Sequence, residues 1–98
     1  IEAEVIDVAT LKPLDEKKIL ESVTKTGRVV IVQEAPITCG YGAEIAARIA
    51  SGALTSLLSP VERVVGYDTV MPYPRTEEHY MPSTDRVVEA AKRVMAYA

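Results

Sequence analysis

The feature that constrains this chain most is a run of four β-branched residues, Val, Val, Ile and Val, at positions 29–32. β-Branched side chains favour strands, and a strand without alternating polar residues is covered on both faces. The chain contains neither Trp nor Phe, so its core has to be built from Val, Ile, Leu and Ala. A core built from these four residue types is typical of a parallel sheet buried between helices. The run therefore predicts an α/β fold.

Extended and helical patterns alternate along the rest of the chain. Strands are expected at residues 3–9, 28–33 and 61–66, and helices at 15–26, at 43–58 and after residue 83. Asp15 and Ser83 are good N-caps, and Gly27 is a good helix stop. Prolines at 72, 74 and 82 predict an extended surface segment before the last helix. Residues 1–98 are therefore predicted to form one domain, a three-layer α/β/α sandwich with a mostly parallel sheet.

Composition and charge exclude several classes of protein. The net charge of −3 and the pI near 5.1 argue against nucleic-acid binding, which needs a concentrated basic face. The single cysteine, Cys39, cannot form an internal disulfide, which favours a reducing compartment. We expect Cys39 to be a small, buried or half-buried thiol. No apolar run approaches the roughly 18 residues of a membrane span. The chain is expected to be a soluble, intracellular protein that binds neither nucleic acid nor membrane.

One turn could bind an anion. Gly40, Tyr41 and Gly42 lie between a predicted strand and a predicted helix, where glycines allow close backbone approach and a helix N-terminus attracts negative charge. A nucleotide fingerprint needs a third glycine, and that position is held by Ile45. Ordinary turn geometry is therefore the preferred interpretation, with phosphate or nucleotide binding as the alternative.

No catalytic set assembles from the remaining polar residues. His79 follows two glutamates, but the chain has no second histidine to complete a metal site, so a surface or interface role is favoured. Cys39 lacks a histidine base at a suitable spacing. Glu34 follows a strand at the edge where α/β sheets bind ligands, but its preferred role is to cap backbone amides in the next turn. Asp68 is interpreted as a turn residue.

The order of the motifs resembles the C-terminal domain of transketolase-like enzymes. The first half carries this resemblance with Glu4-Val5-Ile6-Asp7-Val8, Leu11-Lys12-Pro13-Leu14-Asp15, Glu34-Ala35-Pro36 and Gly40-Tyr41-Gly42-Ala43-Glu44. The second half is similar to the beta subunit of the decarboxylating component of 2-oxo acid dehydrogenase complexes, with Ser59-Pro60-Val61-Glu62-Arg63, Asp68-Thr69-Val70-Met71-Pro72-Tyr73-Pro74 and Glu78-His79-Tyr80-Met81-Pro82. The stretch Glu77-Glu78-His79-Tyr80 looks most like branched-chain-type members, and pyruvate and acetoin enzymes remain open. Deoxyxylulose phosphate synthase shares only the first half of the pattern, and the equivalent domain of such a transketolase-like enzyme is an alternative.

The resemblance implies an assembly role rather than catalysis. In that family, thiamine diphosphate and magnesium lie between the alpha subunit and the N-terminal domain of the beta subunit. No catalytic, cofactor-binding or metal-binding residue is therefore expected in this chain, which alone is predicted to be non-catalytic. The implied partners are a second beta subunit across a two-fold axis, the alpha subunit, and the subunit-binding domain of the acyltransferase core.

Interface residues are expected in two regions. The resemblance implies core docking at residues 59–63 and 95–98, and the proline-held segment predicts aromatic contacts to another subunit. The residues concerned are Ser59, Glu62, Arg63 and Tyr97 in the first region, and Tyr73, His79 and Tyr80 in the second. Packing of these tyrosines within their own domain is the alternative for the second region. The rival function for the whole chain is a free-standing ligand-binding or regulatory module that uses the turn at residues 40–42.

The resemblance also implies a longer domain. The family domain opens with about one more strand–helix unit, so this chain is expected to be a truncated piece. The preceding strand would lie between residues 4–8 and residues 28–32, and without it the first strand needs another partner or a shift onto residues 28–32. The implied location is the cytoplasm, or the mitochondrial matrix in a eukaryote.

Overall fold

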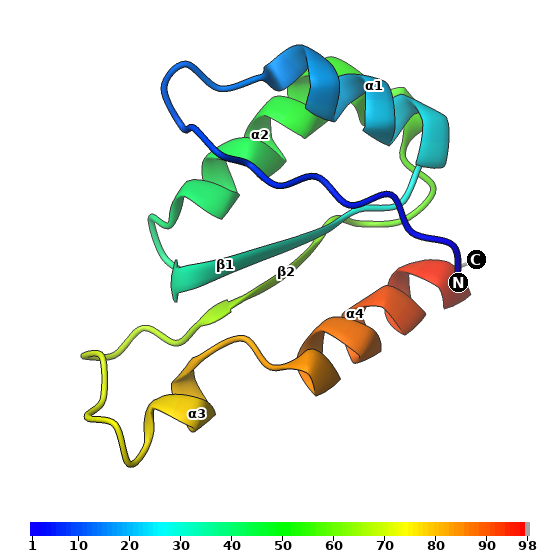
Figure 1. The fold of residues 1–98 in the computed structure, drawn as a ribbon. Helices are drawn as coiled ribbons and strands as arrows, with labels where there is room; N and C mark the ends of the chain where they lie inside the picture. Colours follow the sequence, from blue (N-terminus) through cyan, green and yellow to red (C-terminus); the bar gives the residue numbers. More distant parts are fainter. Residues whose placement is uncertain (98) are drawn as a thin grey trace.

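The computed structural model describes residues 1–97 as helices on both faces of a small sheet. The elements are α1 (Glu16–Thr26), β1 (Val30–Pro36), α2 (Tyr41–Ala53), a 3₁₀ helix η1 (Leu54–Ser56), β2 (Glu62–Gly66), α3 (Glu77–Tyr80) and α4 (Thr84–Ala96). β1 and β2 are parallel, with Val32 opposite Val64. α1 and α2 cover one face and α4 covers the other (Figure 1). The predicted α/β/α layering with parallel strands is confirmed.

The three helix ends predicted at Asp15, Gly27 and Ser83 are confirmed by their backbone geometry and capping contacts. The Asp15 carboxylate accepts a hydrogen bond from the Lys18 amide at 3.2 Å, and the Ser83 hydroxyl oxygen accepts one from the Arg86 amide at 3.2 Å. Gly27 ends α1 with a left-handed backbone (φ 72°), a conformation that costs glycine no steric strain. Helix α2 begins at Tyr41 and ends at Ala53, five residues earlier than expected.

The main core lies between the sheet and the first two helices. Ile19 and Val23 of α1 meet Ile49 and Ala53 of α2, and Ile31 of β1 packs against this cluster. Side chains alternate across a strand, so Val32 projects to the opposite face, where α4 lies. There Val32 keeps 51% of its surface exposed, because α4 covers it only in part.

The strand expected at residues 3–9 does not form. This segment has no sheet partner in the structure, and it runs as an extended chain in the same direction as β1 (Figure 1). Its attachments are made by side chains: Ile6 packs against the core, and Glu4 pairs with Lys25 of α1 at 3.1 Å. Apolar, β-branched residues alone do not make a strand, because a strand also needs a neighbouring backbone to pair with.

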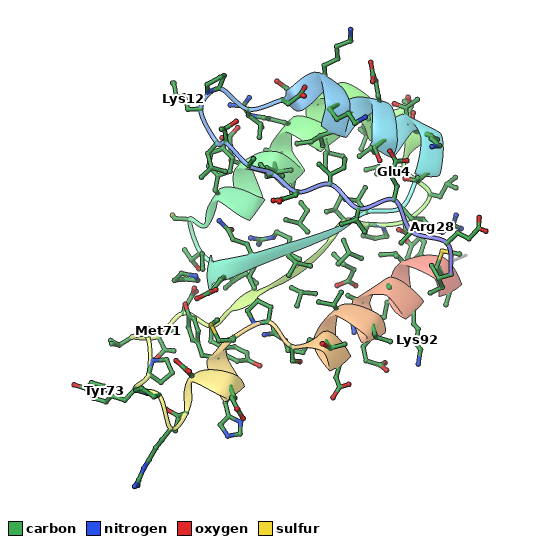
Figure 2. All side chains as sticks on the ribbon, in the orientation of Figure 1. Glu4, Lys12, Arg28, Met71, Tyr73 and Lys92 are labelled. Atoms are coloured by element: carbon green, nitrogen blue, oxygen red, sulfur yellow. The ribbon has the colours of Figure 1, made fainter. Side chains whose placement is uncertain are left out.

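Three arginines attach α4 to the sheet layer. Arg28 Nε donates to the carbonyl of Val94 at 2.8 Å, and Arg86 Nη2 donates to the carbonyl of Val65 at 2.7 Å. Arg93 forms a two-pronged ion pair with Glu62, through Nε at 3.1 Å and Nη2 at 3.2 Å. Figure 2 shows the side chains that fill the space between α4 and the strands. The helix is therefore held by charge-assisted contacts as well as by its buried alanine and valine side chains.

The segment between β2 and α4 differs from the expectation at one point. Residues 67–76 are extended or in turns, as the prolines predict, but residues 77–80 form the short helix α3. Met71 and Tyr73 point away from the body of the domain (Figure 2). No helix within residues 1–97 is long and apolar enough to span a bilayer.

Candidate functional site: a groove between the start of β2 and the end of α4

The groove forms where β2 begins and α4 ends. It encloses about 390 Å³ and is lined by Ser59, Pro60, Glu62, Arg93, Val94, Ala96 and Tyr97. Glu62 is the first residue of β2. Arg93 lies near the end of α4 and Tyr97 directly follows the helix, and both line the opposite wall of the groove. The sequence-predicted residues Ser59, Glu62 and Tyr97 thus line one groove. Ala98 lies outside the described residues.

The polar groups of the groove differ in exposure. Ser59 is buried, and its hydroxyl donates to the carbonyl of Pro60 at 3.3 Å. The hydrogen bonds with Glu62 raise the pKa of Arg93, so this side chain stays charged. Tyr97 is half exposed at the rim. The groove therefore offers a partner an aromatic anchor beside an ion pair, a combination common at protein interfaces.

The other predicted residues lie elsewhere. Arg63 points away from the groove and donates to the carbonyl of Ile37 at 2.9 Å. Tyr73 and His79 are exposed beyond the opposite end of β2. Tyr80 is only 6% exposed, because its ring packs over Gly66 within its own domain. Tyr80 therefore matches the alternative interpretation, packing within the domain.

The glycine turn is occupied by the chain's own side chains. The Gly42 amide donates to the side-chain oxygen of Gln33 at 2.7 Å, and the Tyr41 hydroxyl donates to the carbonyl of Leu11 at 3.0 Å. A Cβ at Gly40 would collide with the backbone oxygen of Pro36, so the glycine is needed for close packing. Gln33 thus uses one of the amides that an anion would require. Sequence reasoning missed this role of Gln33, because a strand glutamine gives no capping signal.

Beside this turn, Asp68 joins two loops. Its carboxylate accepts hydrogen bonds from the amide of Thr38, at 2.9 Å, and from the hydroxyl of Thr38. These bonds lower the pKa of Asp68. The neighbouring Cys39 is exposed and has a positive φ of 61°, so the expectation of a buried or half-buried thiol was wrong. The tight turn held by Thr38 presents the cysteine outward.

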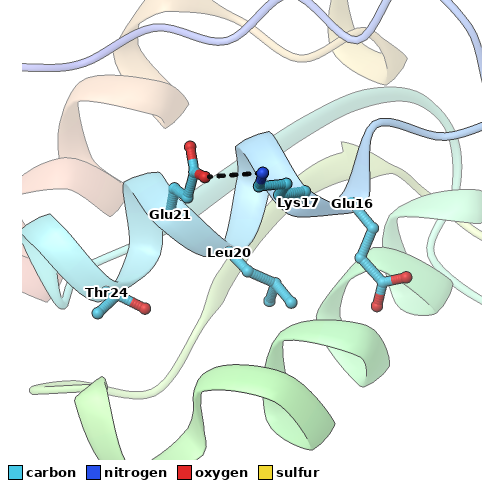
Figure 3. A pocket seen from close by; sticks show the side chains of 5 residues that line it. All are labelled: Glu16, Lys17, Leu20, Glu21 and Thr24. Carbon is cyan, nitrogen blue, oxygen red and sulfur yellow. Dashed lines mark ion pairs between the residues drawn. The ribbon is translucent and has the colours of Figure 1, made fainter.

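A second hollow lies over α1 and contains none of the predicted residues. It measures about 660 Å³ and is lined by Glu16, Lys17, Leu20, Glu21 and Thr24 (Figure 3). Lys17 and Glu21 form a loose ion pair at 4.0 Å. The hollow is open to solvent and brings together no set of groups suited to catalysis or metal binding.

A parallel sheet with helices on both faces makes this chain a three-layer α/β domain. Comparison with known proteins gives its family. Residues 1–87 match the family described as Transketolase, C-terminal domain, so the chain belongs to that family. It is 45% identical over 94 residues to the pyruvate dehydrogenase E1 component subunit beta of Leifsonia xyli, covering 96% of this chain and 28% of the relative. It is 48% identical over 96 residues to the 2-oxoisovalerate dehydrogenase subunit beta of Pseudomonas aeruginosa, covering 97% and 27%.

A further relative gives the same result. The pyruvate dehydrogenase E1 component subunit beta of Bacillus subtilis is 42% identical over 97 residues, covering 99% of this chain and 30% of the relative. The chain therefore spans less than a third of the length of these relatives. The resemblance to 2-oxo acid dehydrogenase beta subunits is confirmed over nearly the whole chain.

The described residues contain no cluster of the side chains that commonly hold a metal ion. Magnesium needs several oxygen ligands converging on one point. Within residues 1–97, no three His, Cys, Asp or Glu side chains gather in that way.

Proposed function

We propose that this chain is the C-terminal assembly domain of a beta subunit in an enzyme that oxidatively decarboxylates pyruvate or branched-chain 2-oxo acids. The observation that carries the proposal is the match over 96–99% of the chain to beta subunits of both enzyme types. Thiamine diphosphate and magnesium would then bind elsewhere in the complete enzyme, and the 98-residue chain would have no activity alone. Its location would be the cytoplasm, or the mitochondrial matrix in a eukaryote.

Within this role, the groove is proposed to dock the subunit-binding domain of the acyltransferase core. Support comes from the convergence of Ser59, Glu62 and Tyr97 on one concave surface. The domain carries a net charge of −3, which suits a basic partner. Tyr97 supplies the aromatic anchor, since large aromatic side chains carry much of the binding energy at interfaces.

The segment with Tyr73 and His79 is proposed to contact a neighbouring subunit, either the second beta subunit or the alpha subunit. Both residues are exposed, and they project from the opposite end of the sheet. The two surfaces are thus separate, so core docking and subunit assembly can be tested independently.

The test is calorimetric titration of the complete protein with the isolated subunit-binding domain. Tyr97→Ala should weaken binding by at least about tenfold, the cost of losing one hot-spot side chain. Leu54→Ala is the control, because it truncates an exposed apolar side chain outside both proposed surfaces. Equal affinities for wild type and Tyr97→Ala would refute docking at the groove. Equal losses in both variants would point to a general effect instead.

A further inference from the structure

Residues 67–80 form a loop whose two ends lie together. The loop leaves the sheet after Gly66, the last residue of β2, and it ends at Tyr80, whose ring packs over Gly66. Between these points it extends away from the body of the domain (Figure 1). Loops of roughly 6–16 residues whose ends meet are Ω-loops, and many of them carry binding residues. The 67–80 loop therefore has the geometry of a binding element.

The outermost side chains of the 67–80 loop are apolar. Val70 is 87% exposed and Tyr73 is 88% exposed, and Met71 also points into solvent (Figure 2). Single exposed apolar side chains are ordinary on a protein surface, but these three lie within four residues and form a patch. The patch belongs to the segment proposed above to contact a neighbouring subunit.

Arg86 of α4 holds the first end of the loop. Its Nη2 donates to the carbonyl of Val65 at 2.7 Å, and its guanidinium carbon lies 5.1 Å from the centre of the Tyr67 ring. A cation over an aromatic face at this distance is attracted to the ring. One side chain thus holds the residues on both sides of Gly66, at the point where the chain leaves β2.

Asp68 makes a second attachment at the same end. Its carboxylate accepts hydrogen bonds from the amide and the hydroxyl of Thr38, which lies in the turn after β1. From residue 69 to residue 79, the hydrogen bonds described join residues within the loop only, such as the Thr76 amide to the carbonyl of Tyr73 at 2.9 Å. The position of the exposed patch therefore depends on the attachments at the two ends of the loop.

The contacts of Arg86 do not suit a purely stabilising role. Its Nη1 atom is buried and has no hydrogen-bond partner within residues 1–97. An unsatisfied buried donor costs free energy, and a buried charged side chain is often replaceable by an apolar one at little loss of stability. A planar guanidinium, in contrast, is able to bind the Val65 carbonyl and stack on the Tyr67 ring at the same time.

We propose that Arg86 is a positioning residue for subunit assembly: it fixes the first end of the 67–80 loop, so that Val70 and Tyr73 are presented in one arrangement. This inference rests on the subunit contact proposed above for this segment. A loop that is already ordered avoids the entropy cost of ordering at the interface. Loss of Arg86 therefore weakens assembly, although Arg86 itself lies outside the exposed patch.

The test measures subunit association of the complete protein by sedimentation equilibrium, without the subunit-binding domain, and urea unfolding of each variant. Arg86→Met should weaken association by about tenfold, the effect of ordering one or two more side chains on binding. Tyr67→Leu should have a similar effect, and adding Arg86→Met to it should cause little further loss. Arg93→Met is the matched control and should associate like wild type, because it removes an α4 arginine that reaches β2 but not the loop.

Tyr73→Ala separates this inference from the proposed function. If Tyr73→Ala weakens association and Arg86→Met does not, only the role of Arg86 is refuted. If neither variant weakens association, the subunit contact at this loop is refuted as well. Equal losses in Arg86→Met and Arg93→Met would also overturn the inference, because both would then act through the general stability of α4. If Arg86→Met does not fold, unchanged association of Tyr67→Leu overturns the inference.

Discussion

Replacing Gly66 with alanine is expected to destabilise the protein by about 1–3 kcal/mol, the usual cost of inserting a methyl group into a filled site. A Cβ at position 66 would lie 2.7 Å from both Cε1 and the hydroxyl oxygen of Tyr80. Carbon atoms in contact are normally about 3.5–4.0 Å apart, so one of the two residues has to move. Tyr80 is buried, and its ring cannot move away without breaking contacts that now hold α3.

A double-mutant cycle isolates this clash. Tyr80→Ala alone should cost about 3–5 kcal/mol, as for other buried aromatic residues. Once the ring is gone, Gly66→Ala should cost almost nothing, which gives a coupling energy of about 1–3 kcal/mol. Urea unfolding of the four proteins measures each term. Gly52→Ala is a control, because its Cβ would meet only the flexible end of Leu20. A cost at Gly66 that stays the same without Tyr80 would refute the reasoning.

Two further predictions concern the core and the loop contact. Ile49→Ala should cost about 2–5 kcal/mol in urea unfolding, because Ile49 is the largest fully buried side chain and its loss leaves a cavity; a cost below about 1 kcal/mol would contradict this. The lowered pKa of Asp68 means that its contribution to stability is present above about pH 4 and is lost as the pH falls through the lowered value. Asp68→Asn should therefore flatten the acid limb of the stability curve, whereas an unchanged acid limb would show that the contact with Thr38 has no effect on stability.

The elements that local chemistry determines could be predicted from the sequence. All but the first residue of the run at 29–32 lies in β1, and Asp15, Gly27 and Ser83 mark the ends of their helices as expected. The failures depend on distant partners. Residues 3–9 have a strand pattern but no paired backbone, and α3 forms within a segment that three prolines suggested would be extended.

The groove shows the same difference between residues that the sequence indicates and contacts that depend on distant partners. Ser59, Glu62 and Tyr97 were found through resemblance, but the role of Arg93 was not predictable. Its partner Glu62 lies 31 positions earlier, and only the packing of α4 on β2 brings the two together. Tyr80 could be recognised as an aromatic anchor, but the sequence could not decide between a neighbouring subunit and Gly66 as its contact.

The arginine contacts of α4 have a consequence for synthesis of the protein on the ribosome. β2 leaves the ribosome before α4, and until α4 arrives the Val65 carbonyl lacks the Arg86 donor that satisfies it in the folded domain. A nascent chain paused in this interval exposes the apolar face of the sheet that α4 later covers, together with the unsatisfied Val65 carbonyl, and exposed apolar surface of this kind promotes aggregation. Codon changes that slow translation between β2 and α4 should therefore increase aggregation more than equal delays placed before β1.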